Sequence, residues 1–147
     1  MSKILITYFT RTGNTEKMAK AIAEGARDNA HVELHRLFEC PKNVESFDAI
    51  LIGSPNYYHA LTHNLKEYLE ELAFRKVSLK GKIGAAFGSY GWSTEVPNLI
   101  LEIMKNRFEM DVVESPLLIK YTPDEKGLDE CRNFGKNIIK KIQQKTS

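Results

Sequence analysis

The chain has 147 residues, 42% of them hydrophobic and 27% charged, which predicts one globular domain over residues 1–147. Lysine and arginine number 21 against 19 acidic residues, so the chain lacks the basic excess typical of a nucleic-acid-binding protein. No apolar segment approaches the roughly 18 residues that a membrane helix needs. The charge balance and the lack of such a segment together indicate that neither nucleic acid nor a membrane is an expected partner.

The first residues and the cysteines indicate the compartment. Met1-Ser2-Lys3 leads directly into a strand-like run without the pattern of a signal peptide, so a cytoplasmic protein is expected. The two cysteines, Cys40 and Cys131, lie far apart and form no C-x-x-C motif. Reduced thiols are therefore expected and no metal site is predicted, although the sequence leaves a single disulfide open.

Strand-like and helical patterns alternate along the whole chain. The expected strands lie near residues 3–9, 31–35, 48–53, 82–88 and 112–121, and the expected helices near 15–28, 61–72, 96–108 and 128–142. The second strand alternates polar and apolar residues, and the fifth contains Pro116, as edge strands do. The other three are apolar runs typical of buried parallel strands. These patterns predict an α/β fold in three layers, with a five-stranded parallel sheet in the order 2-1-3-4-5.

Ligands of such a sheet bind beyond the carboxyl ends of the strands, where the strand order reverses. Three loops are expected there: Thr10–Thr15 after the first strand, 54–59 after the third and 88–94 after the fourth. The first loop is rich in hydroxyl and amide side chains and opens a helix, whose first N–H groups lack partners. Together with the helix dipole these groups predict a phosphate site at Thr10, Arg11, Thr12, Gly13, Asn14 and Thr15.

The other two loops contain four aromatic residues, Tyr57, Tyr58, Tyr90 and Trp92, among serine, glycine and asparagine. A flat ring could stack on these side chains while its phosphate occupies the first loop. The triphosphate motif G-x-x-x-x-G-K-[ST] and the dinucleotide motif G-x-G-x-x-G are both absent from the first loop. The pattern therefore favours a mononucleotide such as FMN.

Structural roles compete with these functional ones. Thr12 and Asn14 are typical helix-capping residues, and either one alone would be read as a cap. Tyr8 and Phe9 are expected in the core, and a lone loop histidine such as His59 is more often solvated than functional.

The motifs resemble those of the flavodoxin family. The segment 8–16, Tyr-Phe-Thr-Arg-Thr-Gly-Asn-Thr-Glu, is similar to its FMN-phosphate signature, and 53–58 is similar to its second flavin loop. The segment 85–93 resembles in particular the flavodoxin domain of flavodiiron proteins. The resemblance covers essentially the whole chain and implies a short-chain, flavodoxin-like fold.

The resemblance also implies a role for each matching position. The phosphate would be held by Thr10, Arg11, Thr12, Gly13, Asn14 and Thr15. One side of the flavin ring would be lined by Ser54, Pro55, Asn56, Tyr57 and Tyr58, and the other by Ser89, Tyr90, Gly91 and Trp92. Trp92 is the expected stacking partner, together with Tyr57 or Tyr58.

Two features depart from the family pattern. Many flavodoxins have a glycine in the second loop whose peptide flips to bond the reduced flavin, whereas loop 54–59 contains no glycine. Many are also strongly acidic, whereas this chain has a net charge of +2, so partner surfaces do not transfer from the family.

The leading hypothesis is an FMN-binding electron-transfer protein that works at low potential between redox-partner proteins and needs no catalytic side chain. The alternative is an enzyme on the same fold, an NAD(P)H-dependent quinone or FMN reductase or a protoporphyrinogen oxidase. A third hypothesis is an interaction module that binds no flavin. The sequence leaves the oligomeric state open.

Overall fold

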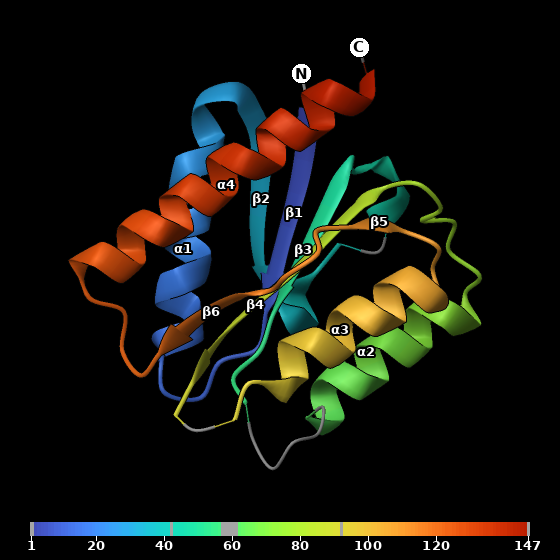
Figure 1. Cartoon of the computed structure of the whole chain (residues 1–147). Helices are drawn as coiled ribbons and strands as arrows, with labels where there is room; N and C mark the ends of the chain where they lie inside the picture. Colours follow the sequence, from blue (N-terminus) through green and yellow to red (C-terminus); the bar gives the residue numbers. More distant parts are fainter. Residues whose placement is uncertain (1, 42, 57–61, 92, 147) are drawn as a thin grey trace.

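The computed structural model describes residues 2–41, 43–56, 62–91 and 93–146, in which strands and helices alternate (Figure 1). The strands are β1 (Ser2–Tyr8), β2 (Ala30–Arg36), β3 (Ala49–Gly53), β4 (Ile83–Tyr90), β5 (Asp111–Val112) and β6 (Leu117–Lys120). The α-helices are α1 (Asn14–Ala26), α2 (His63–Phe74), α3 (Glu95–Asn106) and α4 (Glu125–Thr146). Short 3₁₀ turns are η1 (Arg27–Asn29), η2 (Leu37–Glu39) and η3 (Val44–Ser46).

The strands form one parallel sheet in the order β2-β1-β3-β4-β5, with β6 also paired to β4. The register aligns Ile4 of β1 with Val32 of β2 and with Ala49 of β3, and Ala49 in turn with Ile83 of β4. The predicted strand order is therefore confirmed, with β2 at one edge and the last strand at the other.

The last strand differs from the continuous one predicted over 112–121. It is divided into β5 and β6, which both pair with β4 in parallel. Asp111 pairs with Ile83, 28 positions earlier, whereas Leu117 pairs with Phe87, 30 positions earlier, so two extra residues lie between the pieces. Pro116 lies in this interruption, where its missing N–H costs no ladder hydrogen bond.

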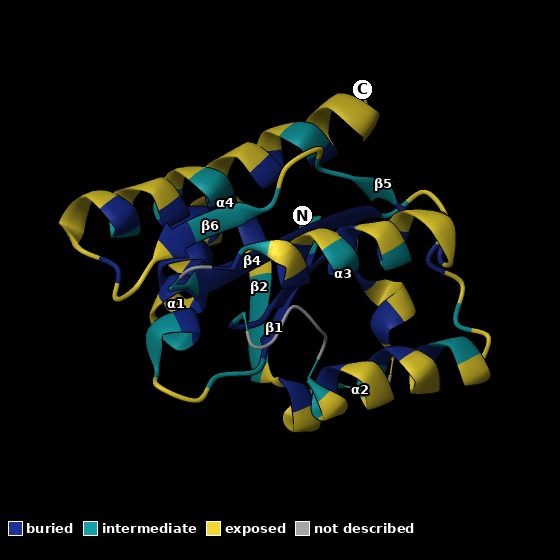
Figure 2. Ribbon diagram, turned by 60° about the horizontal axis from the view of Figure 1, so that its bottom comes forward, coloured by how far each residue is buried: buried dark blue, intermediate teal, exposed yellow. Residues whose placement is uncertain are grey.

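Helices cover both faces of the sheet, with α1 and α4 on one face and α2 and α3 on the other (Figure 1). The alternation of side chains along a strand produces both cores: Ile4 and Ile6 pack with the α1 and α4 side, and Leu5 with the α2 and α3 side. The helices are buried toward the sheet and exposed on their outer surfaces (Figure 2). None of the helices in the described part of the chain is apolar and long enough to span a bilayer.

The two helices α1 and α4 approach each other closely through glycine. A Cβ atom on Gly25 of α1 would lie 2.0 Å from the carbonyl oxygen of Arg132 in α4. A Cβ atom on Gly135 of α4 would lie 2.2 Å from the carbonyl oxygen of Ile22 in α1. Because backbone atoms cannot move aside as a flexible side chain can, this packing requires glycine at both positions.

Replacement of Gly25 by alanine tests this contact. We expect Gly25→Ala to lower the free energy of unfolding by about 1–3 kcal/mol, because the added methyl group forces the two helices apart. Urea denaturation measures the change. Gly127→Ala, in the same α4, is the control: its nearest neighbour, at 3.3 Å, is a carboxylate oxygen of Asp124, and we expect a smaller change. Equal stability of Gly25→Ala and the wild type would contradict the prediction.

Candidate functional site

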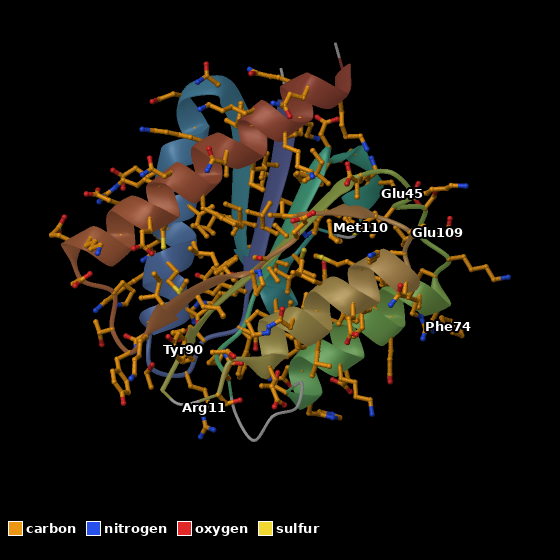
Figure 3. All side chains as sticks on the ribbon, viewed as in Figure 1. Arg11, Glu45, Phe74, Tyr90, Glu109 and Met110 are labelled. Atoms are coloured by element: carbon orange, nitrogen blue, oxygen red, sulfur yellow. The ribbon has the colours of Figure 1, made fainter. Side chains whose placement is uncertain are left out.

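The carboxyl ends of β1, β3 and β4 meet at one edge of the sheet, and a hollow of about 160 Å³ lies among the segments that follow them. Its lining comes from all three predicted loops and from the residue after β6: Thr12, Asn14, Pro55, Asn56, Ser89, Tyr90, Gly91 and Tyr121. Figure 3 shows Arg11 and Tyr90 at this end of the molecule. The structure thus brings together the three loops that the sequence predicts to form the site.

The amino terminus of α1 opens on this hollow without a side-chain cap. Gly13 is the N-cap residue and has a φ of +92°. Because glycine has no side chain, it cannot accept a capping hydrogen bond from the first N–H groups of the helix. Its N–H donates to Thr10 Oγ1 at 3.1 Å, which folds the loop back on itself. A Cβ on Gly13 would meet no atom within 4 Å, so the space before the helix is open. The capping role considered for Thr12 and Asn14 is not observed.

The first and third loops are joined by a buried hydrogen bond. Thr15 Oγ1 lies 3.1 Å from Ser89 Oγ, and both residues are buried. This bond connects the first turn of α1 to the end of β4. This hydrogen bond therefore holds the two loops together, and Ser89 also lines the hollow.

The second loop is tied to the third by Asn56. Its Nδ2 donates to the carbonyl oxygen of Ser89 at 3.1 Å, and its Oδ1 accepts the N–H of Val96 at 2.8 Å. Asn56 thus caps α3, a role that sequence reasoning did not assign to it. Ser54 is buried, and its hydroxyl donates to the carbonyl oxygen of Pro55 at 2.9 Å. The side chains of Ser54 and Asn56 are engaged within the protein, and Pro55 and Asn56 present surface to the hollow.

Three of the predicted ring contacts, Tyr57, Tyr58 and Trp92, lie outside the described residues, as does His59. Their assignment to the flavin ring stays a prediction. The described lining places Tyr90 and Gly91 on the third-loop side of the hollow.

Tyr121 is a lining residue that the sequence analysis missed. It follows β6, and its N–H donates to the carbonyl oxygen of Tyr90 at 2.7 Å. The side chain is 63% exposed. The available signal was an aromatic residue directly after the last strand, where the sheet topology places a fourth segment beside the hollow.

Among the described residues no charged side chain lines the hollow, although two cations lie in segments that approach it. Arg11 is exposed in the first loop, and Lys120 ends β6. Glu16 is the acidic residue in the first turn of α1. Its carboxylate accepts hydrogen bonds from the Tyr8 hydroxyl at 2.7 Å and from Arg36 Nη2 at 3.2 Å. These contacts, the Tyr8 hydrogen bond above all, lower the pKa of Glu16. The carboxylate of Glu16 therefore interacts with Tyr8 of β1 and Arg36 of β2.

Neither cysteine has the features of a reactive thiol. Cys40 and Cys131 are both free, which answers the question of a disulfide. Burial raises the pKa of Cys40, and burial raises the pKa of Cys131 to about 12, so both remain protonated at neutral pH. Within the described segments, no group of three or more His, Cys, Asp or Glu residues is arranged to hold a metal ion.

Two larger hollows lie away from the loops. One of about 600 Å³ is lined by residues of η2 and α2, among them Phe38 and Phe74, and one of about 650 Å³ lies between α3 and β5. Neither includes a residue of the three loops, and neither faces the open amino terminus of α1. Volume alone therefore does not identify the site, whereas the convergence of the strand ends does.

Comparison with known proteins agrees with this arrangement. The flavodoxin family model matches residues 6–135. The chain belongs to the flavodoxin family. A flavodoxin of Aquifex aeolicus is 38% identical over 158 aligned positions, which cover 94% of this chain and 85% of that protein.

Other relatives are longer than this chain. An uncharacterized protein of Methanocaldococcus jannaschii is 35% identical across 93% of this chain, which spans 36% of that protein. The type A flavoprotein of Rhodobacter capsulatus is 32% identical across 92% of this chain, which spans 32% of that protein. The chain thus spans about a third of the length of these two relatives, and the flavodoxin-family part is what they share with it.

Solved structures show the same fold. An archaeal flavodoxin is 35% identical, with a TM-score of 0.89, and the alignment covers 96% of this chain and 99% of that one. The flavodiiron protein of Giardia intestinalis has a TM-score of 0.85 at 21% identity, and the match covers 97% of this chain and 36% of that protein. The fold predicted from the resemblance is confirmed.

The contacts of Glu16 predict a pH dependence of stability. Because its pKa is lower in the folded chain than its ordinary value of 4.5, the unfolded chain binds the proton more readily. The stabilising contribution is therefore complete above pH 4.5 and is lost as the pH falls through the lower, folded-state pKa. We expect Glu16→Gln to be less stable than the wild type at pH 7, by at most about 1 kcal/mol, with the difference shrinking toward pH 3.

Urea denaturation at a series of pH values measures this difference. Glu125→Gln is the matched control, because Glu125 also lies in the first turn of a helix, α4, but on another element from Tyr8 and Arg36. If the difference between Glu16→Gln and the wild type did not change from pH 7 to pH 3, the assigned role of Glu16 would be wrong.

Proposed function

We propose that this chain binds FMN at the open amino terminus of α1 and carries electrons at low potential between redox-partner proteins. The observation that carries the proposal is the unfilled space before α1, where Gly13 holds a left-handed conformation and no side chain caps the helix. An uncapped helix terminus with hydroxyl and amide groups around it is a suitable site for a phosphate. The relatives that are flavoproteins support a flavin as the molecule to which the phosphate is attached.

The donor set matches one terminal phosphate. Thr12 and Asn14 line the hollow, whereas Thr10 and Thr15 shape the loop through their own hydrogen bonds. The backbone N–H groups of the first turn supply further donors, and the helix dipole adds partial positive charge. The first loop contains a single cation, Arg11, and no lysine of the kind that a triphosphate-binding loop uses.

The described residues position and tune the cofactor, which supplies the electron-accepting ring when bound. Pro55, Asn56 and Gly91 offer a largely uncharged surface to that ring. A largely uncharged surface and a nearby phosphate both disfavour extra negative charge on the ring. Both therefore lower the reduction potential of the bound cofactor. Arg11 opposes this effect at the edge of the site.

The first experiment is a titration of the purified protein with FMN and with riboflavin, followed by absorbance and flavin fluorescence. Binding of FMN, without steady oxidation of NAD(P)H when a quinone is added, supports the carrier. Steady NAD(P)H oxidation would instead support a reductase. A protein that binds neither flavin would contradict the proposal and favour an interaction module.

The Thr12→Ala variant tests the phosphate site. We expect it to weaken FMN binding about tenfold or more, because a hydrogen bond to a charged group is lost. Its affinity for riboflavin, which has no phosphate, should stay unchanged. Ser115→Ala, which removes an exposed hydroxyl between β5 and β6, is the control and should bind both ligands as the wild type does. Equal losses for FMN and riboflavin would place the phosphate elsewhere.

A further inference from the structure

Tyr121 stands out among the exposed side chains. Three large hydrophobic or aromatic residues of the described chain are strongly exposed: Phe38, Phe74 and Tyr121. Tyr121 alone of the three lines the hollow at the strand ends, whereas Phe38 and Phe74 line the separate hollow beside α2. An aromatic ring that is left in water at a predicted ligand site gains stabilisation when a flat ligand covers it.

The backbone of Tyr121 is strained in a way that a helix end does not explain. Its φ is +58°, and Lys76 and Glu109 are the other non-glycine residues with positive φ among those described. Those two follow the ends of α2 and α3, where a left-handed residue is common. Tyr121 instead follows a strand, and a bulky residue with positive φ is unusual there. Strain of this kind is concentrated at functional sites.

Specific contacts hold Tyr121 toward the third loop. Its N–H donates to the carbonyl oxygen of Tyr90 at 2.7 Å, directly beyond the pairing of Lys120 with Tyr90. A Cβ on Gly91 would lie 3.4 Å from Tyr121 Cε1, so the ring lies against the backbone of the third loop. The ammonium group of Lys120 lies 5.4 Å from the centre of the same ring.

We propose that Tyr121 is a cofactor-contacting residue, which closes the third-loop side of the hollow by packing its ring against the bound flavin nucleotide. The left-handed backbone presents the ring to the hollow, and Gly91 leaves room for it. The inference rests on the proposed function, since it concerns the same site. It assigns a contact to a fourth segment, beyond the three loops that the sequence predicts.

Tyr121→Ala, Tyr121→Phe and Tyr121→Gly test the inference in the full chain. We expect the FMN dissociation constant of Tyr121→Ala to rise about threefold to tenfold, because a ring contact is lost. Tyr121→Phe keeps the ring and should bind nearly as the wild type does. Phe74→Ala removes another exposed aromatic side chain, at the carboxyl end of α2 (Figure 3), and its FMN affinity should not change.

A second measurement separates the ligand contact from the strain. Without FMN, Tyr121→Gly should unfold about 2–4 °C above Tyr121→Ala, because glycine adopts a positive φ without the Cβ penalty. The same Tyr121→Gly variant should bind FMN as weakly as Tyr121→Ala. If the Tyr121 side chain served folding alone, both variants would be less stable than the wild type, and their affinity for FMN would be unchanged.

The outcomes distinguish the two proposals. If the wild type binds FMN and Tyr121→Ala binds it equally well, the inference about Tyr121 is overturned and the proposed function stands. If the wild type binds no flavin at all, both are overturned. A weaker affinity in Tyr121→Ala and Tyr121→Gly, with Phe74→Ala unchanged, supports the contact.

Discussion

The site depends on the parallel register of β1, β3 and β4, because this register makes three strands end at the same edge of the sheet. Tyr8 pairs with Gly53, and Gly53 pairs with Phe87, so the loops after these strands begin at nearly the same level. The apolar runs that form the strands are buried on both faces by helices. Burial of the strands therefore determines where the polar loops meet.

Once the loops meet, a few buried polar groups fix their relative positions. Ser89 is the common member: its hydroxyl contacts Thr15 of the first loop, and its carbonyl oxygen accepts a hydrogen bond from Asn56 of the second. Asn56 also caps α3 through the N–H of Val96. Buried hydrogen bonds of this kind are costly to leave unmade, so they specify one arrangement of the loops. These hydrogen bonds therefore hold the loops in place around the hollow.

The sequence predicts the elements and the three loops well, because apolar periodicity and strand-end polarity are local signals. It predicts less well what depends on contacts between distant segments. Pro116 indicated an edge strand, but the division into β5 and β6 follows from the pairing with β4. Asn56 was expected to face a ligand, yet its amide is bound to Ser89 and Val96, which lie more than 30 residues away. Tyr121 was missed because its positive φ and its place beside Gly91 are properties of the folded chain.

Helix α1 links the core to the site, because its carboxyl end is tightly packed and its amino end is uncapped. Toward its carboxyl end, α1 packs on α4 so closely that Gly25 faces the carbonyl oxygen of Arg132. At its amino end the helix has no side-chain cap, and its first N–H groups face open space beside Gly13. A helix terminus without a cap is less stable by about 1 kcal/mol, and such an end survives when the rest of the helix is firmly packed. Tight packing against α4 thus allows the other end of the same helix to present unpaired donors, already oriented, to an anionic ligand.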